Sequence, residues 1–120
     1  MSGICTNTGL TFQANSGVPA ASISNPGNDY GCLFTTPNPA WYYLEISQPG
    51  NILMTLTAVL DIDFIMWGPF PNLANAIANC NSYSAADIVP NIPGLQQGCS
   101  YSASNIETPS INNALAGEVY

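Results

Sequence analysis

The chain has 120 residues, the length of one domain, and no Lys, Arg or His accompanies its 7 Asp and Glu residues, so the formal net charge is −7. A chain without basic side chains cannot neutralise the phosphates of nucleic acid or the charge of an anionic membrane surface. It also lacks the residues for a His-containing catalytic triad, a Schiff base or an imidazole metal site. We therefore expect a protein that is not an enzyme.

The composition is that of a folded chain with an almost uncharged surface. Hydrophobic residues make up 47% of the sequence and charged residues 6%, against about 25% charged residues in an average globular domain. Asn, Ser and Thr supply the polarity instead. Because mixed charges normally keep cytosolic proteins apart, this surface indicates a secreted protein or a subunit of an assembly.

Four cysteines, Cys5, Cys32, Cys80 and Cys99, suggest two disulfides formed in an oxidising, extracellular compartment. They include no C-x-x-C pair, and the alternatives are free thiols or a zinc site built from all four thiolates. Of the three connectivities that four cysteines allow, we expect Cys5–Cys32 and Cys80–Cys99, because each bond would join a loop to a nearby strand.

Short segments of alternating apolar and polar residues predict β-strands in the first half of the chain. They cover residues 10–13, 20–23, 32–35, 41–47 and 52–58. The last two are separated by a turn at 48–51 and are predicted to form a hairpin. In the second of them, the apolar side chains that should face the core are Ile52, Met54, Leu56 and Ala58.

The second half of the chain contains the only helical pattern. Residues 73–79 are predicted to form about two helical turns with Asn72 as the N-cap. Strands are expected at 61–67, 100–103, 105–107 and from Ile111, with an extended end at 119–120. No apolar run reaches the length that crosses a bilayer. We expect a single all-β module spanning 1–120, an antiparallel, disulfide-bonded β-sandwich of jelly-roll or immunoglobulin-like type with at most one short helix.

Asp61 and Asp63 are the one close pair of carboxylates. Two residues apart on a strand, they point the same way with roughly 7 Å between their Cα atoms. Asn28, Asp29 or backbone carbonyls would complete a Ca²⁺ site, since Ca²⁺ takes 6–8 oxygen ligands. One alternative is that one carboxylate bonds to loop amides while the other faces water. The other is a glycosidase acid–base pair, which lacks a basic residue to tune it. No other cofactor is expected.

Aromatic side chains are the candidates for ligand contact. Trp41 and Trp67 fall on strand faces opposite the best apolar stripe, so we expect an exposed pair, with Tyr43 beside it. Such rings stack on sugars, and neighbouring amides bond their hydroxyls. The alternative is that these rings fill the core.

Seven motifs in order resemble one known module. They are residues 9–12 (GLTF), 28–33 (NDYGCL), 36–43 (TPNPAWYY), 61–64 (DIDF), 67–70 (WGPF), 99–102 (CSYS) and 117–120 (GEVY). Together they are similar to extracellular modules of very large secreted surface proteins of gliding, flavobacterium-like bacteria. These proteins include gliding-motility adhesins exported by type IX secretion. The DIDF and WGPF motifs are also distantly similar to prepeptidase C-terminal β-sandwich domains.

Modules of this kind continue past the GEVY motif at 117–120 with a further apolar strand. The resemblance therefore implies either that this chain is part of a longer one or that a neighbouring chain donates the missing strand. Other copies or neighbouring domains of a surface assembly are the expected partners, and glycans are the alternative.

The sequence thus predicts a non-catalytic building block or adhesion module, extracellular and at the cell surface, within a larger surface protein or filament. A carbohydrate-binding module is the alternative.

The absence of Lys and Arg gives the first testable prediction. Trypsin cleaves only after these residues, so the reduced and denatured chain should survive trypsin intact while chymotrypsin degrades it. Mass spectrometry of both digests checks this. Tryptic fragments of the purified chain would contradict it.

Overall fold

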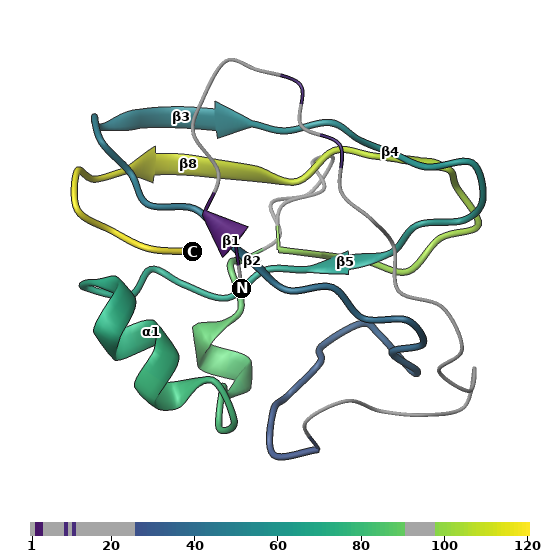
Figure 1. Ribbon diagram of the computed structural model, residues 1–120, viewed down its shortest axis with the longest axis horizontal. Helices are drawn as coiled ribbons and strands as arrows, with labels where there is room; N and C mark the ends of the chain where they lie inside the picture. The colour runs from purple at the N-terminus through teal and green to yellow at the C-terminus, as the bar shows by residue number, and fades with distance from the viewer. Residues whose placement is uncertain (1, 4–8, 10, 12–25, 91–97) are drawn as a thin grey trace.

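The computed structural model describes residues 2–3, 9, 11, 26–90 and 98–120 (Figure 1). The elements in chain order are β1 (Ser2–Gly3), β2 (Tyr42–Tyr43), β3 (Gly50–Leu53), β4 (Leu56–Thr57), β5 (Phe64–Ile65), α1 (Leu73–Asn79), a 3-10 turn (Ala85–Asp87), β6 (Cys99–Ser100), β7 (Ile106–Glu107) and β8 (Ser110–Ala114). This part of the chain is mostly strands with one short α-helix, as the sequence predicts. The strand expected at 20–23, and that at 10–13 apart from Thr11, lie outside the described residues.

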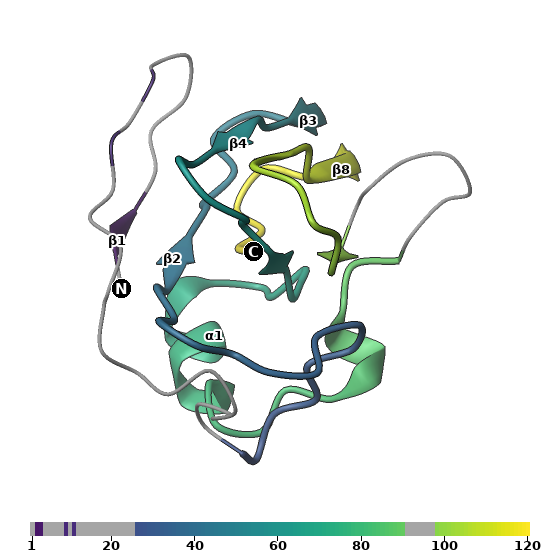
Figure 2. The same cartoon turned by 90° about the vertical axis from the view of Figure 1, so that its right-hand side faces the viewer.

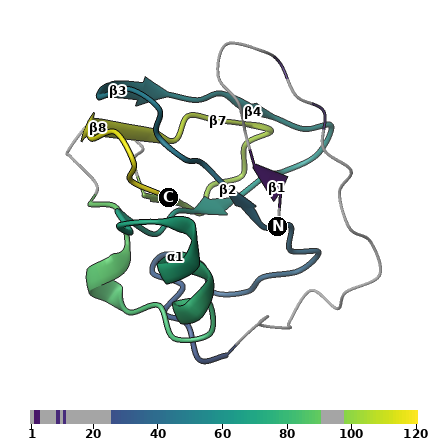
Figure 3. The same ribbon diagram turned by 60° about the vertical axis from the view of Figure 1, so that its left-hand side comes forward.

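The strands form small pairs. β3 pairs with β8, β4 with β7 and β5 with β6, all antiparallel, whereas β1 and β2 are parallel. Between the first two pairs the Met54 amide donates to the Pro109 carbonyl, at 2.9 Å, so β3–β4 and β7–β8 form one antiparallel ribbon. Figures 1 and 3 show this ribbon along one side of the molecule.

The side-chain alternation predicted for 52–58 is confirmed. The residues predicted to face the core, Ile52, Met54, Leu56 and Ala58, are half-buried. Leu53, Thr55 and Thr57, which alternate with them, are exposed. The alternation arises because successive side chains on a strand point to opposite faces.

The predicted hairpin between 41–47 and 52–58 is wrong. Leu44 and Ile46 exchange backbone hydrogen bonds of 2.7–2.9 Å with the segment 117–120. Their side chains nevertheless share a core cluster with Ile52 and Met54. Two strands can bury their apolar faces against each other across a core without being hydrogen-bonded neighbours. The alternation therefore predicts which face of a strand is buried, but not which strand pairs with it.

Val119 joins two parts of the chain. It is 0% exposed and forms antiparallel bridges with Glu45 on one side and Phe70 on the other. Phe70 and Val119 exchange both backbone hydrogen bonds, at 2.8 and 2.9 Å. The extended conformation expected at 119–120 is thus confirmed, and Val119 is bridged to the chain on both sides.

Helix α1 has the predicted bounds. The Asn72 side chain accepts a 2.8 Å hydrogen bond from the Asn75 amide, which caps the first turn. Ala76 is buried, and the Tyr83 hydroxyl donates to its carbonyl at 2.7 Å. Figure 2 shows α1 on the side of the molecule away from the β3–β8 pair. Among the described helices none is long and apolar enough to traverse a lipid bilayer.

Two hydrophobic clusters form the core, and adjacent residues of one segment point into different ones. The first contains Tyr30, Trp67, Phe70, Ala76, Tyr83 and Val119, and the second Leu44, Ile46, Ile111 and Ala114. Met66 packs against the second cluster while Trp67 belongs to the first. Both faces of this segment are therefore covered.

The disulfide joins Cys32 to Cys99, at a sequence separation of 67. Both expected pairings, Cys5–Cys32 and Cys80–Cys99, are therefore wrong, because Cys32 and Cys99 are bonded to each other. Cys5 itself lies outside the described residues. Within the described part of the chain Cys80 is a half-buried free thiol. The region 32–35 is a turn and not a strand. The turn depends on Gly31, whose φ of 54° favours glycine and where a Cβ would meet the side chains of Ile88 and Ile65.

Replacing both bonded cysteines, as Cys32→Ala with Cys99→Ala, should lower the free energy of unfolding by about 4 kcal/mol, because the bond closes a long loop in the unfolded chain. Cys80→Ala is the control and should cost less. Urea unfolding measures both, and non-reducing peptide maps after pepsin should contain a peptide that links Cys32 to Cys99. A Cys80–Cys99 peptide from native protein would contradict the structure.

Candidate functional site

Asp61 and Asp63 organise the loop between β6 and β7. The Asp61 Oδ1 accepts a 2.9 Å hydrogen bond from the Ser104 amide, and the Asp63 Oδ1 accepts a 3.1 Å bond from the Ser102 amide. Both aspartates are exposed, as expected for residues on one outward face. Both carboxylates bond to loop amides through their Oδ1 atoms, whereas the loop-amide alternative expects this of one of them.

Asn28 and Asp29 have different partners. The buried Asn28 amide donates to the Cys80 carbonyl at 2.9 Å and accepts from the Tyr83 amide at 2.9 Å. Asp29 accepts a 2.8 Å bond from the Gly31 amide. Within the described ranges no three acidic or cysteine side chains gather closely enough to hold a metal ion together. The structure therefore offers no three-carboxylate cluster of Asp29 with Asp61 and Asp63.

Glu107 is the functional candidate that the sequence did not indicate. Its side chain is 0% exposed, and its Oε1 accepts a 2.6 Å hydrogen bond from the Ser102 hydroxyl. Burial, followed by the charges of Asp61 and Glu107, raises the pKa of Asp63, while the hydrogen bond from Ser102 lowers it. Three carboxylates thus surround one loop.

The expected exposed pair of tryptophans is wrong for Trp67, which is 7% exposed. Its ring stacks on Trp41 at a centroid distance of 5.4 Å and an interplanar angle of 10°. It also meets Tyr30 edge to face at 5.6 Å, and its Nε1 donates to the Asp29 carbonyl at 3.0 Å. Trp41 and Tyr43 are half-buried against the same cluster. Trp67 is buried because the first hydrophobic cluster covers the strand face opposite the apolar stripe, which the sequence predicts to be exposed.

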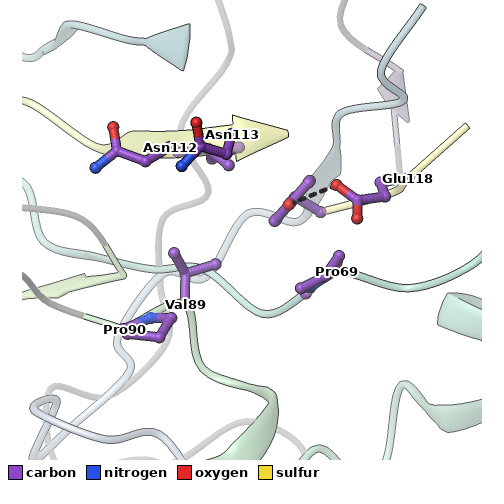
Figure 4. A pocket seen from close by; sticks show the side chains of 9 residues that line it. Pro69, Val89, Pro90, Asn112, Asn113 and Glu118 are labelled. Atoms are coloured by element: carbon purple, nitrogen blue, oxygen red, sulfur yellow. Dashed lines mark hydrogen bonds between the residues drawn. The ribbon is translucent and has the colours of Figure 1, made fainter. Parts of the chain in front are cut away.

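A pocket of about 300 Å³ lies between four short segments of the chain (Figure 4). Pro69, Val89 and Pro90 form its apolar wall, while Asn112, Asn113 and Glu118 contribute polar atoms. No local sequence motif predicts this pocket, because its lining residues are distant in sequence and meet only in the folded chain.

Glu118 and Tyr120 are coupled at one edge of this pocket. The Tyr120 hydroxyl donates to the Glu118 Oε2 at 2.9 Å, and the Leu115 amide donates to the same oxygen at 2.7 Å. Burial, the hydrogen bond and the Glu118 charge raise the pKa of Tyr120, in that order. At neutral pH this edge of the pocket is therefore a neutral phenol bonded to a carboxylate. The combination suits an uncharged, hydroxylated ligand.

No protein-family model, curated protein or solved structure matches the chain. The functional inference therefore depends on the geometry of its own residues.

The raised pKa of Tyr120 predicts loss of stability in alkali. Above its usual value of 10.0 the unfolded chain releases the phenolic proton while the folded chain retains it, so the free energy of unfolding falls as the pH rises past 10. Tyr30 and Tyr83, whose pKa is also raised chiefly by burial, act in the same direction. Tyr120→Phe should make the decline shallower. Urea unfolding at pH 9, 10 and 11 measures it, with absorbance at 295 nm following ionisation.

Glu118→Gln is the matched variant, because it removes the charge that opposes ionisation and should lower the pKa of Tyr120 in the folded protein. Identical pH dependence in wild type and Tyr120→Phe would contradict the assignment.

Proposed function

We propose that this protein is a non-catalytic extracellular module, a structural or adhesive building block of a larger cell-surface protein or filament. Its composition supports a contact function, since a net charge of −7 without a basic residue leaves few groups for acid–base chemistry. The Cys32–Cys99 disulfide is compatible with an oxidising compartment. We further propose that the small strand pairs together form a β-sandwich.

The contact role is supported by exposed apolar side chains at one end of the ribbon formed by β3–β4 and β7–β8. Val59 and Leu60, in the turn that follows β4, are 95% and 78% exposed. Ile106, which pairs with Thr57 across the ribbon, is also exposed. In Figure 1 this turn forms the free end to the right of the β4 label. Apolar groups gathered at a free end favour contact with another protein surface.

The resemblance to modules of gliding-motility adhesins points to the same class. It suggests export by type IX secretion and a position among neighbouring modules or copies, by strand donation or by surface contact. Segment 117–120 already pairs with both 44–46 and Phe70, so a donated strand would have to pair elsewhere.

A carbohydrate-binding module is the second candidate, and the pocket beside Glu118 and Tyr120 favours it. Amide groups and a phenol–carboxylate pair bind sugar hydroxyls, and proline rings offer apolar faces. The chain has no cation to recognise a sulfated or uronic-acid glycan, so a neutral glycan is the ligand expected.

Surface labelling tests the extracellular assignment. Antibodies raised against the purified chain should label intact, unpermeabilised source cells, and proteinase K should remove the label. Labelling that appears only after permeabilisation would contradict the proposal.

The contact role predicts weak self-association or docking through the exposed turn. In analytical ultracentrifugation, or in pull-down with the neighbouring modules, Val59→Ser combined with Leu60→Ser should weaken association at least tenfold. Leu115→Ser removes an exposed leucine beyond β8 and should have little effect. Equal association in both variants would exclude the turn. Binding to a neutral glycan that is lost in Asn113→Ala would instead favour the carbohydrate-binding function.

A further inference from the structure

Glu107 lies in an environment that ordinarily requires a counter-charge. Its backbone pairs with Leu56 across β4 and β7, and its side chain is fully buried. The Oε1 accepts the hydrogen bond from Ser102, whereas the buried Oε2 has no hydrogen-bond partner among the described residues. An ionised carboxylate in such a position costs several kcal/mol unless a cation or a full set of donors compensates it.

The chain itself supplies no cationic side chain. In most proteins a buried carboxylate is paired with Arg, Lys or His, and this sequence contains none of the three. A positive charge that balances Glu107 cannot therefore come from a side chain of this sequence, and a metal cation is able to supply it.

A second carboxylate is bonded to the same residue as Glu107. Ser102 donates its hydroxyl to Glu107, at 2.6 Å, and its amide to Asp63, at 3.1 Å, so both acidic groups approach one residue. Asp61, bonded to Ser104 in the same loop, adds a third negative charge nearby. The charges of Asp61 and Glu107 act on Asp63 as like charges do at short range. A cation at this point would relieve the repulsion and supply the partner that the Glu107 Oε2 lacks.

We infer that a Ca²⁺ ion binds here, with Glu107 and Asp63 as its charged ligands. Ca²⁺ suits the site because its flexible shell of 6–8 oxygens accepts hydroxyl, carbonyl and water ligands, which would complete the coordination around the two carboxylates. Zinc is disfavoured by the absence of His and of a thiol cluster among the described residues. Asn28 and Asp29 form their hydrogen bonds with Cys80, Tyr83 and Gly31, not with the loop of Ser102 and Ser104, so we do not include them among the ligands of this ion.

Thermal unfolding with and without Ca²⁺ tests the inference on the purified, oxidised chain. Extracellular sites commonly bind with a Kd of about 10⁻⁴–10⁻³ M. At 10 mM CaCl₂ the melting temperature should rise by about 5 °C over its value in chelator. NaCl at matched ionic strength is the essential control, because general screening also stabilises a chain of net charge −7.

Two isosteric variants and one matched control test whether Glu107 and Asp63 are responsible for the calcium-dependent rise in melting temperature. Glu107→Gln should be at least as stable as wild type in chelator, because it buries no charge, and should lose the calcium-dependent rise. Asp63→Asn should need at least tenfold more Ca²⁺ for the same rise. Glu45→Gln removes one charge from an exposed position and should keep the full rise.

A melting temperature unchanged by CaCl₂, or an equal rise with NaCl or in Glu107→Gln, would overturn the inference. Each result leaves the proposed surface function to be judged by its own labelling experiment.

Discussion

The absence of any basic side chain is the constraint on which this structure depends. No carboxylate can form an ion pair with another side chain, and several are stabilised by backbone amides instead. Asp29, Asp61, Asp63, Asp87 and Glu118 each accept a hydrogen bond of 2.7–3.1 Å from an amide two, three or about forty residues away. Such charge-assisted bonds are stronger than neutral ones and satisfy donors that loops would otherwise leave unpaired. The few charges of the chain therefore hold its loops in place.

Glu107 departs from this arrangement, and its position explains why. It is on β7, where the backbone amides are used in pairing, and its side chain is buried where, among the described residues, only Ser102 donates a hydrogen bond to it. A carboxylate retained at such a position has little value for packing, since a Gln or Leu of similar volume would cost less to bury. Its presence is reasonable where the missing partner is an ion that the chain binds after folding.

The sequence predicted what depends on local patterns. The helix bounds at 73–79 followed from Asn72 and the apolar spacing, and the inward face of 52–58 followed from strict alternation. Partners distant in sequence were not predictable in this way, because Cys32 and Leu44 find Cys99 and Tyr120 through the assembled fold. Burial of Trp67 was missed because a second hydrophobic cluster covers the strand face that one apolar stripe appeared to leave free. The pocket and the Glu107 environment likewise form from separate segments.

A crystal structure from calcium-containing solution, with anomalous diffraction data, tests the central claim most directly. The account predicts an anomalous peak 2.3–2.6 Å from the Glu107 Oε2, with Asp63 in the same coordination shell and Asp29, Asp61, Asp87 and Glu118 on their backbone amides. A Glu107 side chain that turns to solvent, or a buried Glu107 with no ion beside it at saturating calcium, would contradict the account.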